Sequence, residues 1–137
     1  MNKIFSNTMR FNRVLPWYGL LLIVLLCALL TYKEGFGTSA TTFANDVAGK
    51  KVFVLFYSEN CGYCKTLKPV WDKVAESNPD TMVAFECSST DPETKAICKK
   101  YGINSYPTMM VLDNGVAQNT YDGDRSEASL TSFVANL

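Results

Sequence analysis

The chain has 137 residues and carries 13 basic and 13 acidic side chains, so its formal net charge is zero. A neutral chain has no long-range attraction for nucleic acid or anionic surfaces, and we therefore expect no nucleic-acid partner. The length leaves room for one small domain. Histidine is absent from the sequence, which excludes histidine-based catalysis and every metal site that needs a histidine ligand.

The first predicted element is an apolar segment near the N-terminus. Residues 14–32 read VLPWYGLLLIVLLCALLTY and contain no charge. At about 1.5 Å per residue, a helix of this length spans roughly 28 Å, which is enough to cross the hydrocarbon core of a bilayer. Trp17, Tyr18 and Tyr32 suit the two interfaces between lipid and water. The segment therefore predicts a transmembrane signal anchor. Within it, Cys27 is interpreted as a small apolar residue, with palmitoylation or intermolecular pairing as alternatives.

Charges on either side of this segment predict its orientation. Residues 1–13 contain three basic side chains and no acid, whereas Lys33 and Glu34 follow the segment. The positive-inside rule then gives a cytosolic tail over residues 1–13. It places the rest of the chain in the ER lumen, the periplasm or the exterior, where disulfides persist. The alternative is a signal peptide whose cleavage releases a secreted protein, although the apolar stretch exceeds the roughly 7–15 residues usual for that signal.

A short polar segment separates the anchor from the folded part. Residues 33–41 hold two glycines and several small polar residues, which predicts a flexible tether. We expect a single domain over residues 42–137, beginning with a helical turn over 42–48. The run VFVLFY at 52–57 follows, and its length and its β-branched and aromatic content predict a strand buried on both faces.

A cysteine pair comes shortly after this strand. Cys61-Gly62-Tyr63-Cys64 opens a segment with helical apolar spacing that extends to about residue 77. The N-terminus of a helix offers unpaired N–H groups and partial positive charge, both of which lower the pKa of a thiol placed there. These features predict a redox-active pair in which Cys61 is the nucleophile. Cys64, one turn further on and less exposed, is then the resolving thiol.

Other interpretations of this pair are a permanent structural disulfide and half of a zinc site. Zinc would need Cys87 and Cys98 as its remaining ligands, and these do not form a second tight Cys-x-x-Cys motif. We therefore expect neither a bound metal nor a cofactor. For Cys87 and Cys98 themselves we favour a structural disulfide between the end of a strand and the next helix. Two buried thiols and a second redox switch are the alternatives.

The remaining elements alternate between strands and helices. Asp91 and Pro92 suit a helix cap and a first helical position, Gly102 ends that helix, and Asn114-Gly115 predicts a tight hairpin turn. Strands joined through a helix should be parallel, and strands joined by a hairpin are antiparallel. This gives an α/β fold with a central mixed four-stranded sheet flanked by helices. The expected elements are strands at 81–87, 109–112 and 116–121, a helix from 91 to 102, and a last helix that begins at Ser126.

This order of elements and motifs resembles the thioredoxin-fold family over about residues 41–137. The resemblance implies a thioredoxin fold, here preceded by one transmembrane helix, and disulfide exchange on protein substrates. It implies that Pro107 is a cis proline next to the active-site cysteines, that Tyr106, Pro107 and Thr108 bind the substrate chain, and that Gly62 and Tyr63 support the site. The motifs that carry the resemblance are Cys61-Gly62-Tyr63-Cys64-Lys65, Pro69, Lys100-Tyr101-Gly102-Ile103, Tyr106-Pro107-Thr108, Asn114-Gly115 and Gly123.

Within the family, the sequence looks like the protein disulfide isomerase branch. Phe56-Tyr57 before the cysteine motif, the membrane-crossing leader and the Cys87/Cys98 pair carry this similarity. The Gly-Tyr dipeptide between the active-site cysteines is also similar to that of some bacterial periplasmic disulfide isomerases. Tyr63 replaces the histidine of the eukaryotic disulfide isomerases, so a charge that stabilises the thiolate is missing.

The sequence departs from the family at three further positions. Many members carry a buried acid six residues before the first active-site cysteine, and that residue here is Leu55. A lysine often found on the neighbouring strand is replaced by an apolar residue, which we assign to Phe85. The expected consequence is slow proton transfer at Cys64 unless Glu59 or water serves it. Asn60 stands where relatives carry an exposed tryptophan, so we expect a less apolar substrate groove.

The sequence thus predicts a membrane-anchored thiol–disulfide oxidoreductase with protein disulfide isomerase-like activity. It is expected to exchange disulfides with protein dithiol or disulfide substrates and with a redox partner that the sequence does not identify. The alternative function is a redox-quiet thioredoxin-fold module that serves binding or assembly at a membrane. Leu55 and Phe85 favour this alternative, because both replace groups that handle protons in the family.

Overall fold

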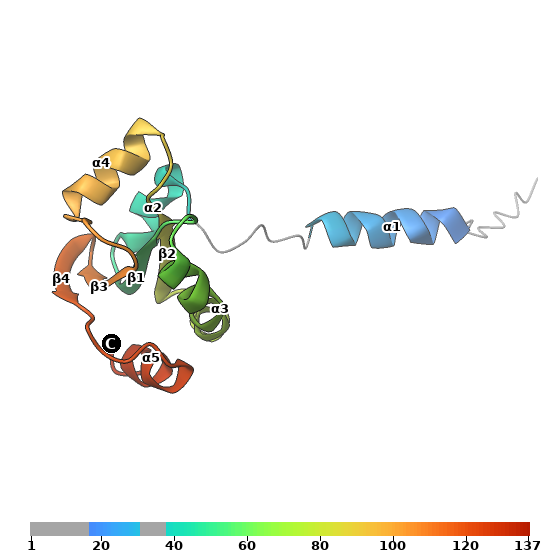
Figure 1. The fold of residues 1–137 in the computed structure, drawn as a ribbon. Coiled ribbons are helices and arrows are strands. Elements are labelled where there is room, and N and C mark those ends of the chain that lie inside the picture. The colour runs from blue at the N-terminus through green and yellow to red at the C-terminus, as the bar shows by residue number, and fades with distance from the viewer. Residues whose placement is uncertain (1–16, 31–37) are drawn as a thin grey trace, which may run out of the picture. The chain divides into compact units, whose positions relative to one another are not determined.

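The computed structural model describes residues 17–30 and 38–137 (Figure 1). The chain divides into two compact units, residues 1–34 and 35–137. Helix α1 runs from Trp17 to Leu30 in the first unit, and no helix among the described residues is long and apolar enough to span a bilayer. The predictions for residues 1–16, for residues 31–37 and for the side chain of Cys27 lie outside what the structure describes.

The second unit begins earlier than the sequence predicts. Thr38 forms an isolated parallel bridge with Phe85, and its N–H donates to the carbonyl of Ala84 at 2.9 Å. Helix α2, Ala40–Val47, starts directly afterwards with Ser39 as its N-cap residue. The prediction of a flexible tether up to residue 41 is therefore wrong for residues 38–41. The physical reason is that Thr38 pairs with an open strand edge, and that the carbonyl of Ser39 accepts the first helical N–H, that of Phe43, at 3.0 Å.

Four strands form one mixed sheet in the order β2-β1-β3-β4. Strand β1 runs parallel to β2 and antiparallel to β3, and β3 runs antiparallel to β4, so the predicted parallel and hairpin pairings are confirmed. Every residue of β1 after its first is buried, which confirms the strand predicted from the apolar run. The bounds of the strands are β1 Lys51–Tyr57, β2 Met82–Glu86, β3 Thr108–Asp113 and β4 Val116–Thr120.

Helices cover both faces of the sheet (Figure 1). Helices α3 (Gly62–Ser77) and α5 (Glu127–Val134) pack on one face, and α2 and α4 (Pro92–Lys100) pack on the other. Successive residues of a strand point to opposite faces, so β1 contributes to two apolar clusters. The α3-side cluster includes Phe53, Leu55, Tyr57, Cys64, Trp71, Ala84 and Leu130. The α4-side cluster includes Phe43, Val54, Phe56, Phe85, Cys87, Cys98 and Met110.

The predicted ends of elements are confirmed at two places. Asn114 and Gly115 have φ values of 50° and 73°, which form the hairpin turn between β3 and β4. Asp91 caps α4, since its carboxylate accepts the N–H of Thr94 at 2.8 Å, and Gly102 follows the helix with a φ of 66°.

Gly123 lies in the loop between β4 and α5 and has a steric role. A Cβ atom at this position would lie 2.6 Å from the ring of Tyr121. That ring is held in turn by Phe53 and Phe133, with centroids 5.4 and 4.6 Å away. A larger residue at 123 would force rings of the core to move, which is costly in a close-packed interior. The hydroxyl of Tyr121 also donates to the carbonyl of Asp124 at 2.7 Å, which ties this ring to the loop that carries Arg125.

Candidate active site

Cys61 and Cys64 lie at the start of α3, directly after the central strand. Cys61 is the N-cap residue of the helix, with φ −87° and ψ 121°, and its side chain is half-buried. Cys64 lies in the first turn and is 2% exposed, because its side chain faces the α3-side cluster. Both cysteines are free thiols, so the structure shows the pair in its reduced form.

The two thiols have opposite pKa shifts. The backbone N–H of Cys64 is the largest influence lowering the pKa of Cys61, and the Cys64 side chain and the backbone of Tyr63 add to it. Burial raises the pKa of Cys64 to about 11, although a hydrogen bond from the backbone of Ser58 acts in the other direction. The thiolate is the reactive form of cysteine, so Cys61 is the more reactive of the two near neutral pH.

Arg125 is the smallest of the influences on the pKa values of the two thiols, and the sequence analysis did not name it. Its positive charge lowers the pKa of both Cys61 and Cys64. Arg125 lies in the loop before α5, more than sixty positions after the cysteines. A single exposed arginine gives no sign in the sequence that it acts on a distant site. Its position after Gly123 is the one feature that could have drawn attention to it.

The Tyr106-Pro107 segment lies beside the reactive thiol. The peptide bond between these two residues is cis, and the thiol of Cys61 donates a hydrogen bond to the carbonyl of Tyr106 at 3.5 Å. Thr108 follows as the first residue of β3, and its hydroxyl donates to the carbonyl of Ser105 at 2.7 Å. Tyr106, Pro107 and Thr108 are all half-buried, so part of each faces solvent next to Cys61.

Gly62 and Tyr63, the two residues between the cysteines, are exposed. The side chain of Tyr63 is 76% exposed, which leaves an aromatic surface next to Cys61. Gly62 is the first residue of α3, and a Cβ there would meet no atom within 4 Å. A larger residue would therefore fit at this position without a clash. Of these two residues, only Tyr63 presents a side chain to solvent.

The surroundings of Cys64 hold no buried carboxylate at the expected place. Leu55 is fully buried in the same cluster as Cys64, and its partner on β2 is Ala84. Phe85 packs in the other cluster, with its ring 4.6 Å from that of Phe43. The assignment of Phe85 as the apolar neighbour of Leu55 on the next strand is therefore wrong. In parallel strands the directly paired residues share a face, and this places Ala84 beside Leu55.

Two other groups near this end of the sheet could accept the proton of Cys64. They are Glu59, which the sequence analysis named for this role, and the phenol of Tyr57. Glu59 is exposed, so solvent screens its charge. Tyr57 is almost fully buried in the cluster that contains Cys64, and burial, followed by the charge of Glu86, raises its pKa to about 12. Its phenol therefore keeps its proton at neutral pH and is no base for Cys64.

Cys87 and Cys98 form a disulfide on the other face of the sheet. The S–S distance is 1.94 Å and the Cα atoms are 6.1 Å apart. Cys87 follows the end of β2 and Cys98 lies in α4, and each is 7% exposed. The four cysteines of the domain are therefore divided into two pairs that belong to different clusters, so they do not form a common four-cysteine site.

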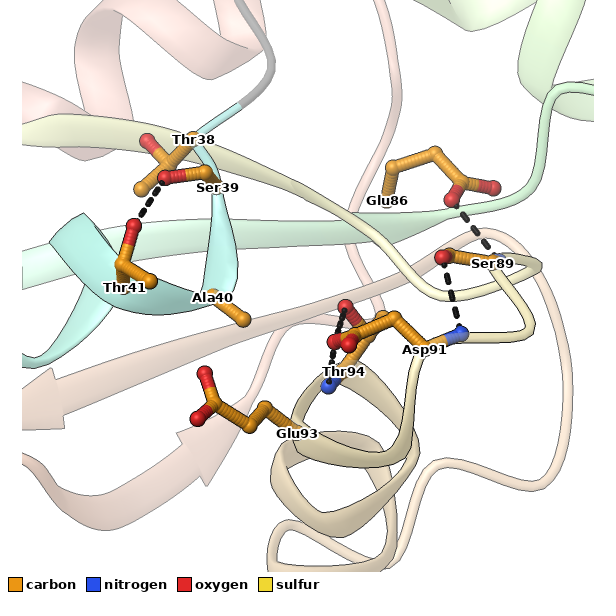
Figure 2. Close-up of a pocket in the computed structure, with 9 residues that line it drawn as sticks. All are labelled: Thr38, Ser39, Ala40, Thr41, Glu86, Ser89, Asp91, Glu93 and Thr94. Carbon is orange, nitrogen blue, oxygen red and sulfur yellow. Dashed lines mark hydrogen bonds between the residues drawn. The ribbon is translucent and has the colours of Figure 1, made fainter.

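A cavity of about 360 Å³ lies between α2, the end of β2 and α4, and none of the predicted site residues lines it (Figure 2). Its polar groups are largely bonded to one another. The N–H of Ser89 donates to Glu86 at 3.0 Å, that of Asp91 donates to the hydroxyl of Ser89 at 3.1 Å, and that of Thr94 donates to Asp91. These bonds fix the loop between β2 and α4, which is the loop that the disulfide closes.

The domain matches a known family model over most of its length. The model described as thioredoxin matches residues 36–136. The chain belongs to the thioredoxin family. The matched range includes both cysteine pairs and the Tyr106-Pro107 segment, so the family assignment covers the whole candidate site.

The relatives of this thioredoxin-family chain include protein disulfide isomerases. It is 35% identical over 104 residues to protein disulfide-isomerase 1 of Dictyostelium discoideum, covering 72% of the chain and 28% of the relative. It is 30% identical over 100 residues to the thioredoxin domain-containing protein 5 homolog of Drosophila melanogaster, covering 71% and 24%. The chain therefore spans about a quarter of the length of these two curated relatives.

A solved structure shows the same fold. The first two thioredoxin domains of Naumovozyma dairenensis Eps1p superimpose with a TM-score of 0.65 and 25% sequence identity. The match covers 75% of this chain and 40% of that one.

The opposite pKa shifts predict selective alkylation of the reduced chain. A thiol reacts with iodoacetamide as the thiolate. Cys61, whose pKa is lowered from 9.0, is expected to react at pH values below that figure, whereas Cys64, with a pKa of about 11, becomes reactive only in more alkaline solution. At pH 8 about one Cys64 thiol in a thousand is ionised, by the standard titration relation.

Mass spectrometry of peptides from a pH series measures this selectivity. The expected order of midpoints is Cys61 first and Cys64 at least two pH units later, from the shifts above. Equal midpoints, or an earlier reaction of Cys64, contradict the assignment of the two environments. The unfolded chain in guanidinium chloride is the control, since both thiols should then titrate alike.

Proposed function

We propose that this chain is a membrane-anchored thiol–disulfide oxidoreductase that exchanges disulfides with protein substrates through Cys61 and Cys64. The observation that carries the proposal is the asymmetry of the pair. A half-exposed thiol of lowered pKa caps the helix, and a buried thiol of raised pKa follows in the first turn. The relatives named as protein disulfide isomerases support the same chemistry.

The reaction begins with the thiolate of Cys61. It attacks one sulfur of a substrate disulfide, so that a Cys61–substrate disulfide forms and the other substrate sulfur leaves as a thiolate. Cys64 then loses its proton to solvent and attacks the sulfur of Cys61. The Cys61–Cys64 disulfide forms, the first substrate sulfur leaves as a thiolate, and the substrate has gained the two electrons that the pair has lost. The reverse sequence oxidises a substrate dithiol.

The Tyr106-Pro107-Thr108 segment supplies the substrate-binding surface in this proposal. Its backbone lies beside Cys61, with the Tyr106 carbonyl 3.5 Å from the sulfur. An extended substrate chain that lies along this segment brings its disulfide to the reactive thiol. Tyr63, with most of its ring exposed, provides the adjacent apolar contact. Asn60 is exposed and polar, which makes this end of the surface less apolar.

The fate of the Cys64 proton sets the expected speed of the second step. Leu55 and Ala84 are both apolar and lie with Cys64 in one cluster, so no carboxylate at these positions accepts the proton. Transfer to solvent then has to accompany the attack, and this slows resolution of the mixed disulfide. The same two residues favour the alternative function, a redox-quiet binding or assembly module.

The test that separates the two functions is the loss of Cys61. In insulin-reduction and dithiol-refolding assays of the full chain, Cys61→Ser is expected to lower the exchange rate at least about a hundredfold, because the nucleophile is absent. Cys27→Ser is the matched control, since it removes a thiol far along the chain from the pair. Equal activity of the wild-type chain and Cys61→Ser contradicts the oxidoreductase and favours the redox-quiet module.

The proposal also includes an anchor over residues 14–32, with residues 1–13 in the cytosol and the domain in the ER lumen, the periplasm or the exterior. Two observations support it. Nineteen consecutive residues carry no charge, and the side chains of residues 21–26, all apolar, are 51–64% exposed in α1. Such a continuous apolar surface is suited to contact with lipid.

Membrane extraction and protease treatment test the anchor. The full chain expressed in cells is expected to remain with the membranes after alkaline carbonate washing, and its domain is expected to resist protease in sealed vesicles. Detergent, which opens the vesicles, is the control. A soluble chain that has lost its first residues indicates a cleaved signal peptide instead, and a domain degraded in sealed vesicles contradicts the orientation.

A further inference from the structure

The Cys87–Cys98 disulfide is attached at both ends to segments of the active site. At one end, the N–H of Cys87 donates to the carbonyl of Tyr57 at 2.8 Å, so this cysteine is fixed to the end of β1, just before the reactive pair. At the other end, the carbonyl of Cys98 accepts the N–H of Ile103 at 2.9 Å. Ile103 begins the segment that leads to Tyr106, so Cys98 holds the origin of that segment.

Tyr106 connects this region to the reactive thiol. It is half-buried and packs against both clusters, the one with Cys64 and the one with the disulfide. Its carbonyl accepts the hydrogen bond from Cys61. A displacement of α4 relative to β2 therefore has a short path to the reactive sulfur, through the backbone of residues 98–106 and the ring of Tyr106.

We propose that the Cys87–Cys98 disulfide is a positioning element of the active site, which holds the Tyr106 segment at the distance from Cys61 that substrate binding requires. This inference rests on the proposed function, because the Tyr106 segment needs a fixed position only if the chain binds a disulfide substrate there. The disulfide joins the strand that lies beside β1 to the helix from which the segment starts. Without it, one end of the segment is fixed only by non-covalent packing.

The loop between the two cysteines has its own hydrogen bonds, so α4 is expected to form without the disulfide. Figure 2 shows the bonds from Ser89 to Glu86, from Asp91 to Ser89 and from Thr94 to Asp91. They hold the start of α4 near the end of β2. The last turn of α4 and the segment beyond it carry no such bonds to this loop, and these are the parts that we expect to shift.

The test compares the full-length Cys87→Ala/Cys98→Ala variant with the wild-type chain, both purified in mild detergent. The Michaelis constant for a disulfide-containing peptide is expected to rise about five- to tenfold while kcat changes less than about twofold, because the peptide-binding segment is misplaced and the nucleophile is intact. Val47→Ala is the matched control. Val47 lies in α2 and belongs to the same α4-side cluster as the disulfide. Its replacement by alanine is expected to lower the melting temperature without changing the Tyr106 segment.

A second readout does not depend on catalysis. Loss of the bond from the Cys61 thiol to the Tyr106 carbonyl removes a contact that favours the protonated thiol. The pH midpoint of Cys61 alkylation is therefore expected to move to lower pH in the double variant and to stay unchanged in Val47→Ala. Tyr106→Ala keeps this carbonyl but removes the ring that packs against both clusters, so it is expected to displace the segment and to move the midpoint in the same direction. Its combination with the double cysteine variant should add little to either change.

The outcomes separate the two proposals. A wild-type chain that exchanges no disulfide refutes the proposed function, while a shifted alkylation midpoint in the double variant still supports the positioning role. An active wild-type chain whose Michaelis constant and alkylation midpoint are both unchanged by loss of the disulfide, with only a lower melting temperature, overturns the positioning role. So does an equal change in Val47→Ala, since it assigns the effect to general loss of stability.

Discussion

Replacement of Cys64 by serine is expected to convert the transient mixed disulfide into a stable one. Cys64 is buried and lies one helical turn from Cys61, and its backbone N–H and its thiol donate hydrogen bonds to the Cys61 sulfur, so its thiol is the group placed to attack that sulfur. A hydroxyl at the same place does not form a disulfide. The lifetime of the adduct should then increase at least about a hundredfold, since its release depends on external thiols.

The adduct is measured by non-reducing electrophoresis and mass spectrometry after incubation with a disulfide-containing protein such as insulin. The variant with serine at both positions is the control, because it lacks the nucleophile and should give no adduct. An active wild-type chain whose Cys64→Ser variant accumulates no adduct contradicts the assignment of Cys61 as nucleophile. An adduct that persists in the double variant points to another cysteine.

The second large effect is expected at Leu55. Glutamate at this position places a carboxylate in the cluster that contains Cys64, where it can accept the proton of that thiol. Resolution of the mixed disulfide is then expected to become at least about tenfold faster, a modest part of what general base catalysis contributes in enzymes. Glutamine has nearly the same shape as glutamate and no ionisable group, so Leu55→Gln is the matched control.

The same substitution is expected to cost about 2–4 kcal/mol of stability at neutral pH, because Leu55 is fully buried and an ionised group has no partner there. Burial raises the pKa of a carboxyl, so the folded chain binds its proton more tightly than the unfolded chain does. Stability of Leu55→Glu is therefore greatest in acid and falls as pH rises through the titration of the buried group.

Denaturant unfolding between pH 5 and 8 measures this fall, and rapid chemical quenching of the mixed disulfide measures the rate. The glutamine variant should show the loss of stability without the pH dependence or the faster resolution. Equal resolution rates in the glutamate and glutamine variants mean that proton transfer does not limit the second step. The apolar residue at 55 then has no kinetic consequence.

Much of the fold follows from local patterns in the sequence. The strand at 52–57, the helix that starts at the cysteine pair and the Asn114-Gly115 turn are all confirmed, because each has a strong local signal. The strand is recognised from an apolar run, the helix from apolar residues at helical spacing, and the turn from two residues that adopt positive φ. All three signals come from residues that are close together in the sequence. The two faces of the mixed sheet could be predicted for the same reason.

The errors and omissions concern contacts that the fold creates between distant segments. Thr38 joins the folded unit because the edge of β2 is open to it, and a window of small polar residues gives no sign of this. Phe85 was placed beside Leu55, whereas the register of β1 and β2 puts Ala84 there. The charge of Arg125 acts on the pKa values of the cysteines from a loop more than sixty positions later in the chain. Register and loop course are tertiary properties.

The division of the cysteines between two clusters has a further consequence for the electrochemistry of the chain. The α3-side cluster and the α4-side cluster lie on opposite faces of the sheet, so the sheet separates the two pairs. A partner that reaches the half-exposed Cys61 does not thereby reach Cys87 or Cys98, each only 7% exposed. The domain over residues 38–137 therefore holds a free thiol pair and a disulfide in separate clusters. Under the proposed function, a partner that oxidises or reduces the Cys61/Cys64 pair is therefore expected to leave the Cys87–Cys98 disulfide unchanged.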